Sequence, residues 1–129
     1  MEPNRKSSAM ERVKDAKADI ENLTPQQVQS ELSHPNVVLV DIREKEELDQ
    51  LGKIPQAIHA PRGMLEFYAD PSLPYHKPEF DGQNRIILHC ASGGRSALAA
   101  KTLKEMGYTK VAHMDGGFKA WKDQGLPVS

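Results

Sequence analysis

Cysteine is nearly absent from this sequence of 129 residues, which contains Cys90 and no other. A single thiol excludes a disulfide within the chain and a zinc site built from several cysteines. His34, His59 and His113 lie on separate segments without the spacing of metal ligands, and we interpret them as structural. The sequence therefore predicts neither a metal nor another cofactor.

Excess charge and long apolar runs are also absent. The 17 basic and 18 acidic side chains leave a net charge of -1, which argues against a nucleic-acid or membrane partner bound through net charge. The apolar runs at residues 37–40 and 86–88 have the length of strands and not of membrane spans. The N-terminus, Met1 to Lys6, is followed by polar residues instead of an apolar signal-peptide core. We therefore predict a cytoplasmic protein with a free thiol and no nucleic-acid or membrane partner.

A chain of this length has room for one ordinary core. Apolar residues recur every three or four positions from Met10 to Leu23, which predicts a weakly amphipathic helix over about residues 8–22. We expect this helix to lie on the surface of the main fold. The predicted organisation is an N-terminal helical extension, residues 1–22, followed by a single domain, residues 23–129.

Strand-like and helix-like segments alternate along the rest of the chain. Short apolar or β-branched runs predict strands at residues 37–42, 57–60, 85–89 and 110–114. Helices are predicted at residues 25–32, 44–51, 64–68, 96–106 and 118–124, with irregular structure over the remainder of residues 61–82. Thr24 and Gln27 have the spacing of a capping box at the start of the first of these helices. The alternation predicts an α/β fold with a mostly parallel sheet.

Ligands of parallel α/β sheets bind at the carboxyl ends of the strands, which directs attention to Cys90. This thiol follows a predicted strand, and a glycine-containing turn and the start of a helix follow the thiol. Backbone N–H groups curled around one point form a nest for an anion, and the positive end of the helix dipole adds to its field. We therefore predict that Cys90 is a catalytic residue held as the nucleophilic thiolate. The alternative, an inert core cysteine, is disfavoured by the turn that follows.

The predicted substrate- and anion-binding loop consists of Ala91, Ser92, Gly93, Gly94, Arg95 and Ser96. Its two glycines permit the sharp curl, its two small residues leave the mouth of the nest open, and its arginine adds a permanent cation. Strand side chains alternate between faces, so His89 should point away from the nest and serve in packing.

Two further groups are interpreted as structural. Asp41 and Arg43 are expected to form an ion pair or hydrogen bonds at the end of a strand. Phe118 and Trp121 are expected to be core residues.

Four short motifs stand in order along the chain, at residues 38–44, 52–58, 90–96, and 115–121 with 125–128. Their order and spacing resemble those of the rhodanese domain family, specifically single-domain thiosulfate sulfurtransferase-like proteins, from about Leu23 to Val128. The resemblance implies a rhodanese-like α/β domain, with a mostly parallel five-stranded sheet and helices on both faces.

The resemblance also implies a sulfurtransferase. In this chemistry the Cys90 thiolate takes a sulfane sulfur from a small-molecule donor such as thiosulfate and forms a persulfide. A thiol or cyanide acceptor then removes that sulfur in a two-step ping-pong scheme. Backbone N–H groups around the loop can stabilise the charge on the terminal sulfur.

The chain departs from the family pattern at several positions. Lys53 replaces a histidine and Gln56 replaces a glycine, changes that we expect to be structurally neutral. The loop lacks the basic residues that some members carry beside the cysteine, which leaves Arg95 as its only cation. Arg62, at a neighbouring strand end, is a candidate accessory cation, and an exposed surface arginine is the alternative for it.

Two other functions use similar residues. A persulfide carrier or interaction module would exchange sulfur with a protein donor or acceptor. Cysteine phosphatases and arsenate reductases use a similar loop with one more residue between its cysteine and its arginine. The shorter ring between Cys90 and Arg95 should fit one added sulfur atom better than a tetrahedral oxyanion, so we predict negligible phosphatase activity.

Overall fold

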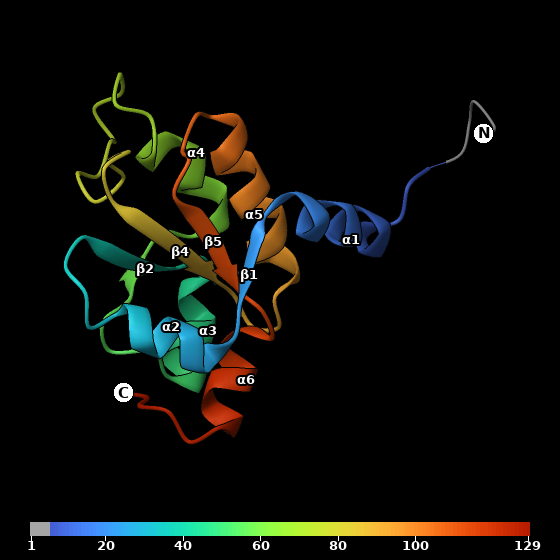
Figure 1. The fold of residues 1–129 in the computed structure, drawn as a ribbon, viewed down its shortest axis with the longest axis vertical. Helices are drawn as coiled ribbons and strands as arrows, with labels where there is room; N and C mark the ends of the chain where they lie inside the picture. Colours follow the sequence, from blue (N-terminus) through green and yellow to red (C-terminus); the bar gives the residue numbers. More distant parts are fainter. Residues whose placement is uncertain (1–5) are drawn as a thin grey trace.

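Within residues 6–129, the part of the chain that the computed structural model describes, five strands form one parallel sheet (Figure 1). The strands are β1 (Glu21–Leu23), β2 (Val37–Asp41), β3 (Ile58–His59), β4 (Arg85–His89) and β5 (Val111–Met114), in the spatial order β1-β5-β4-β2-β3. The continuous apolar runs of β2 and β4 place these strands in the interior of the sheet, because an inner parallel strand is covered on both faces. The four strands predicted from the sequence are therefore confirmed.

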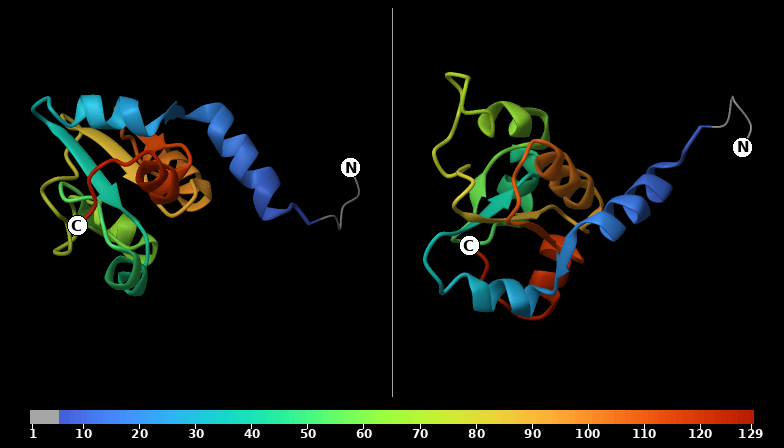
Figure 2. Two further views of the ribbon diagram at one scale, coloured as in Figure 1. Left: turned by 90° about the horizontal axis from the view of Figure 1, so that it is seen from below. Right: turned by 45° about the horizontal axis from the view of Figure 1, so that its top comes forward.

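Helices cover both faces of this sheet (Figures 1 and 2). They are α1 (Ala9–Asp19), α2 (Pro25–Glu31), α3 (Lys45–Leu51), α4 (Leu65–Tyr68), α5 (Gly94–Glu105) and α6 (Gly117–Asp123), with a 3-10 turn, η1 (Arg62–Met64), before α4. Side chains of α4 and α5 pack on one face of the sheet, and those of α2 and α6 pack on the other. The predicted α/β architecture, with helices on both faces of a parallel five-stranded sheet, is confirmed.

The side chains of β4 alternate between the two layers and so determine where Cys90 points. Ile86 and Leu88 belong to the cluster that packs against α4 and α5, whereas Ile87 belongs to the cluster under α2 and α6. Cys90, two residues beyond Leu88, lies in the same cluster as Leu88. The thiol is therefore at the carboxyl end of a central strand, on the α5 side of the sheet.

The N-terminal helix is present within its predicted bounds. The Ser8 side chain caps α1 by accepting a hydrogen bond from the Glu11 backbone N–H at 3.0 Å. Val13 and Ala16 of α1 are buried against Ala97 of α5. The first five residues of the predicted 1–22 extension lie outside the described residues, and the division at residue 22 stays a prediction.

β1 follows α1 directly and was not among the strands that the residues predicted. It pairs in parallel with β5, so that Asn22 lies opposite His113. Its sequence has neither the alternation nor the apolar run that marks a strand, since Leu23 is its one apolar and one buried residue.

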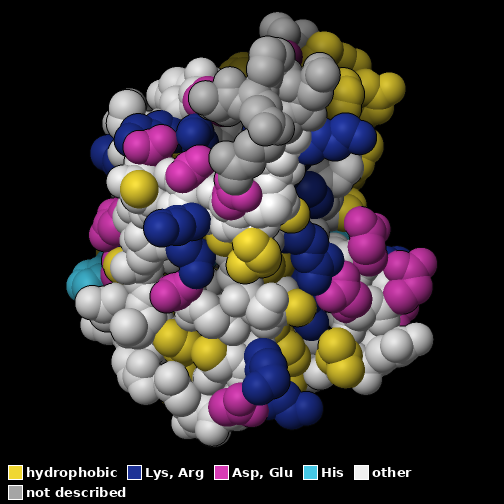
Figure 3. All heavy atoms as spheres, turned by 90° about the vertical axis from the view of Figure 1, so that its right-hand side faces the viewer, with side chains coloured by type: hydrophobic (Ala, Val, Ile, Leu, Met, Phe, Trp, Pro, Cys, Tyr) yellow, Lys and Arg dark blue, Asp and Glu magenta, His cyan; other side chains and the backbone are white. Residues whose placement is uncertain are grey.

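Figure 3 shows the face that carries α1, where basic and acidic side chains are interleaved with scattered apolar ones. Ion pairs join this helix to the domain: Lys17 Nζ lies 2.8 Å from Asp115 Oδ1, and Lys101 Nζ lies 3.3 Å from Asp19 Oδ2. Among residues 6–129, none of the helices combines the length and the apolar character that crossing a membrane requires.

Candidate active site around Cys90

Cys90 is the first residue after β4, and the loop that follows curls around its sulfur. The backbone N–H of Gly93 donates to Sγ at 3.2 Å, and that of Ser96 donates to it at 3.4 Å. Cys90 is 1% exposed, so the sulfur lies at the bottom of the loop and the amides face it from within the protein. Two donors aimed at one buried sulfur can stabilise a negative charge there.

A left-handed glycine produces this curl. Gly93 has φ 106° and serves as the N-cap of α5, which therefore begins at Gly94, two residues earlier than predicted. This conformation favours glycine, and a Cβ at Gly93 would also lie 3.2 Å from the backbone nitrogen of Gly116. The positive end of the α5 dipole thus lies at the sulfur.

The start of α6 fixes the other side of the loop through its backbone. Phe118 N–H donates to the Cys90 carbonyl at 2.8 Å, and Lys119 N–H donates to the Ala91 carbonyl at 3.0 Å. This close approach depends on Gly117, where a Cβ would lie 2.6 Å from the carbonyl carbon and oxygen of Ala91. The closing motif of the sequence therefore holds the cysteine loop in place.

Arg95, the cation of the loop, is bound by a carboxylate. Its Nη1 and Nη2 donate to Oε1 and Oε2 of Glu47 in α3 at 2.8 and 2.9 Å. The hydrogen bonds from Arg95 lower the pKa of Glu47 to about 2. The positive charge that the sequence predicted for donor binding is thus compensated by Glu47, a residue that sequence reasoning did not single out, and the role of Arg95 toward a donor stays a prediction.

Arg62, the candidate accessory cation, has other partners. Its Nη1 donates to Glu66 Oε1 at 2.7 Å, and its Nη2 donates to Thr102 Oγ1 at 3.4 Å. It lines a hollow together with Arg12 and Lys101, and none of the Cys90 loop residues lines that hollow. The structure does not bring Arg62 to the sulfur, and an accessory role for it stays a prediction.

The opposite face of the sheet carries a buried polar cluster. Arg43 Nη2 lies 2.8 Å from Asp41 Oδ2, and both side chains are buried, which confirms the predicted ion pair. Burial acts to raise the pKa of Asp41, but the hydrogen bonds from Arg43 and the charges of His89 and Arg43 together outweigh it, and the pKa lies below its usual value. The Arg43 guanidinium also lies over the Phe118 ring, 4.2 Å from its centroid. His89 points to this side, with its ring 6.4 Å from that of Phe118, as strand alternation predicted.

A second buried histidine lies on the sulfur side. His113, which we interpreted as structural from the sequence, lies on β5 in register with Leu88 of β4. Its Nδ1 is 2.9 Å from Ser96 Oγ, and Ser96 Oγ is 3.5 Å from Cys90 Sγ. Residues in register on neighbouring parallel strands share a face, so His113 lies on the same face as Leu88. Sequence reasoning could have found this only by placing β5 beside β4.

Beside the loop lies a hollow of about 340 Å³, which is lined by Arg43, Leu51, Ala91, Phe118, Lys119, Lys122 and Asp123. Its lining is mostly apolar, and of its two lysines Lys119 is paired with Asp123, with Nζ 3.4 Å from Oδ2. Among the described residues, no group of three or more histidine, cysteine, aspartate or glutamate side chains could hold a metal ion.

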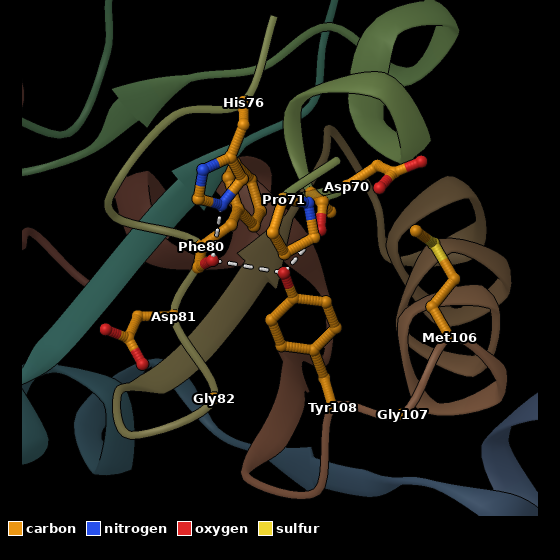
Figure 4. A pocket seen from close by; sticks show the side chains of 10 residues that line it. Asp70, Pro71, His76, Phe80, Asp81, Gly82, Met106, Gly107 and Tyr108 are labelled. Carbon is orange, nitrogen blue, oxygen red and sulfur yellow. Dashed lines mark hydrogen bonds between the residues drawn. The ribbon is translucent and has the colours of Figure 1, made fainter. Parts of the chain in front are cut away.

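A hollow of about 580 Å³ lies at the amino ends of β4 and β5, away from Cys90 (Figure 4). Figure 4 shows the Tyr108 hydroxyl at its centre, where its one hydrogen has two acceptors, the carbonyls of Ala69 and Phe80, at 2.5 and 3.1 Å. His76 Nε2 lies 2.9 Å from the same Phe80 carbonyl. These bonds tie the irregular segment before β4 to the residues before β5.

The family model of the rhodanese-like domain matches residues 24–124 of the chain. The rhodanese domain-containing protein CG4456 of Drosophila melanogaster is 37% identical over 103 residues, which cover 76% of this chain and 93% of that protein. A sulfurtransferase of Allochromatium vinosum is 34% identical over 93 residues, which cover 72% of this chain and 78% of that protein. A structure from Rhodopseudomonas palustris, described as a possible tyrosine phosphatase, has a TM-score of 0.92 and 41% identity, and the match covers 100% of this chain and 99% of that one.

Proposed function

The chain belongs to the rhodanese-like domain family, and we propose that it is a sulfurtransferase whose Cys90 carries the transferred sulfur atom. One observation carries this proposal: the Gly93 and Ser96 amides both donate to the Cys90 sulfur, at 3.2 and 3.4 Å. An inert core cysteine has no need of such donors, whereas a sulfur that becomes anionic during a reaction does. A sulfurtransferase among its relatives supports the same chemistry.

The reaction needs no oxidant or reductant other than its substrates. The Cys90 thiolate attacks the outer sulfur of thiosulfate, a bond forms between Sγ and that sulfur, and the bond to the sulfite sulfur breaks with its electron pair leaving on sulfite. The terminal sulfur of the resulting persulfide is negatively charged. Cyanide or a thiolate then bonds to it, and the Sγ–sulfur bond breaks to restore the Cys90 thiolate.

The hollow beside Ala91 supports small anionic substrates. Lys119 and Lys122 line it, and Asp123 is its one carboxylate. A sulfur donor such as thiosulfate is anionic, and so is a thiolate acceptor. Cys90 itself does not line this hollow, so we propose it as the side from which the donor and the acceptor approach the loop, past Ala91. A cytoplasmic location stays a prediction.

Steady-state kinetics with thiosulfate and cyanide test this proposal. We expect the parallel double-reciprocal lines of a ping-pong mechanism, and no turnover by Cys90→Ser with its circular dichroism spectrum unchanged. Turnover that survives in Cys90→Ser would contradict the proposal. A persulfide that forms on Cys90 only when a protein donor is supplied would favour the sulfur carrier instead.

Phosphatase activity is the other reaction that the comparisons raise, through the description of the Rhodopseudomonas palustris structure. Two features of this chain oppose it. Only four residues separate Cys90 from Arg95, and the Arg95 guanidinium is bound bidentately by Glu47. We expect no hydrolysis of p-nitrophenyl phosphate above the rate of the Cys90→Ser variant. Hydrolysis by the wild type that is lost in Cys90→Ser would contradict this expectation and indicate a phosphatase.

A further inference from the structure

A chain of hydrogen bonds leads from the Cys90 sulfur to the N-terminal segment. At the end away from the sulfur is Asn22 of β1, whose Nδ2 donates to the carbonyls of Lys17 and Ile20 at 3.0 and 3.2 Å. Because carbonyls only accept, these two bonds fix the side-chain amide so that its oxygen faces His113. Asn22 Oδ1 lies 2.8 Å from His113 Nε2.

The orientation of Asn22 determines the tautomer of His113. An amide oxygen can only accept, so His113 Nε2 carries a hydrogen. Burial lowers the pKa of His113 to about 4, with Asp115 acting to raise it and Lys17 to lower it further, so the ring is neutral at neutral pH. In a neutral ring with hydrogen on Nε2, Nδ1 is bare and accepts. The Ser96 hydroxyl, 2.9 Å away, therefore donates to Nδ1 in preference to the Gly93 carbonyl, which lies farther from it at 3.3 Å.

The same bond determines what Ser96 offers to the sulfur. A hydroxyl has one hydrogen, and with that hydrogen on His113 the oxygen presents lone pairs to the Cys90 thiol, 3.5 Å away. This arrangement suits S–H and not S⁻. A hydroxyl that donates to the anionic sulfur requires that His113 Nδ1 acquire a hydrogen of its own.

We propose that Ser96 and His113 form a proton relay for Cys90, with Asn22 holding the histidine in the tautomer that receives the proton. The thiol hydrogen passes to Ser96 Oγ while the Ser96 hydrogen passes to His113 Nδ1. One proton moves in total, and the products are a thiolate that accepts from Ser96 and an imidazolium that donates to Ser96. The proton returns by the same route when Cys90 is restored to a thiol.

The charges around the relay support this direction of transfer. Burial destabilises a protonated His113 by removing it from water. An anion at Sγ stabilises it by charge attraction. Of the other charged groups nearby, Lys17 is paired with Asp115 at 2.8 Å and Arg95 with Glu47 at 2.8 Å, and Arg95 also interacts with the Cys90 sulfur, where its charge favours the thiolate. All three relay residues are almost completely buried, with Ser96 and His113 at 0% and Cys90 at 1% exposure, so the route from sulfur to histidine lies inside the protein.

The relay deepens the proposed function, but its test needs no sulfur donor. The rate of Cys90 alkylation by iodoacetamide is measured as a function of pH in the wild type, Ser96→Ala, His113→Asn and the double variant. Each single variant should move the rising limb of the profile to higher pH by about one unit, which is roughly tenfold slower alkylation at neutral pH. The double variant should be no slower than either single one, because the two residues act in series.

His89→Asn is the matched control, since it removes a buried histidine next to Cys90 whose ring contacts the Cys90 carbonyl and not Sγ. We expect its profile to coincide with that of the wild type. Wild-type profiles for Ser96→Ala and His113→Asn would overturn the relay, and so would a shift in Ser96→Ala alone. A shifted profile in a protein that forms no persulfide with thiosulfate would support the relay while contradicting the proposed function.

Discussion

Arg95 in α5 and Glu47 in α3 form a bidentate ion pair, with N–O distances of 2.8 and 2.9 Å. The pair joins the first turn of α5, which faces the Cys90 sulfur, to the helix that follows β2. Because its two hydrogen bonds are parallel, the guanidinium is held in one orientation at the edge of the loop. The loop cation is therefore part of the scaffold that shapes the nest.

This pair predicts a pH dependence of stability. The pKa of Glu47 is lowered to about 2, so the pair contributes stability above the unfolded pKa near 4.5 and loses it as the pH falls toward 2. Both side chains are partly exposed, so we expect about 1 kcal/mol or less. The difference in free energy of unfolding between the wild type and Glu47→Gln, from urea titrations, should shrink over this range. A difference in unfolding free energy that is the same above pH 4.5 and near pH 2 would contradict this account of the pair.

His113 predicts a second window at higher pH. Its pKa is lowered from 6.5 to about 4, mainly by burial, so between these values the unfolded chain binds a proton that the folded protein does not. The contribution of His113 to the free energy of unfolding is therefore fully present above pH 6.5. It decreases by on the order of 3 kcal/mol as the pH falls to about 4. His113→Asn should remove this part of the decrease in urea titrations. A variant that loses stability between pH 6.5 and 4 as steeply as the wild type would show that other groups cause the decrease.

Gly117 predicts the sensitivity of the loop to a single methyl group. Gly117→Ala would place a Cβ 2.6 Å from the Ala91 carbonyl at a φ of 62°, and we expect a loss of about 1–3 kcal/mol in stability. The displaced loop should also change the rate of Cys90 alkylation. Gly63→Ala is the control, because nothing lies within 4 Å of its added Cβ, and both measurements should stay near wild type. Equal effects at the two positions would contradict the role assigned to Gly117.

The buried ion pair on the other face predicts a non-additive pair of substitutions. Arg43→Met leaves the buried Asp41 carboxylate without its partner and should cost about 3–5 kcal/mol of unfolding free energy. The double variant Asp41→Asn/Arg43→Met removes the orphaned charge and should recover a large part of that loss. Chemical denaturation of both proteins measures the difference. If the double variant is less stable than Arg43→Met, the orphaned charge is not the cause of the loss.

Local sequence patterns were sufficient for most of the fold. The apolar runs at residues 37–42 and 85–89 became β2 and β4, and Thr24 with Gln27 forms the predicted capping box at the start of α2. The position of Cys90 also followed locally, because a strand, a glycine turn and a helix start stand next to one another in the chain.

The parts that were missed depend on contacts between distant segments. Glu47 is 48 residues from the arginine that it binds, and its local sequence marks it only as the capping residue in the first turn of α3. Asn22 belongs to a three-residue strand that exists because β5 lies beside it. His113 reaches the site only because β5 pairs with β4, an order of strands that the sequence pattern does not determine.

Intact-protein mass spectrometry after incubation with thiosulfate tests the central claim most directly. The wild-type chain should gain the mass of one sulfur atom, and cyanide should then remove it. Cys90→Ser, treated in the same way, should stay at its original mass. A wild-type protein that remains unchanged, or a Cys90→Ser protein that gains the same mass, would contradict the account of Cys90 as the residue that carries sulfur.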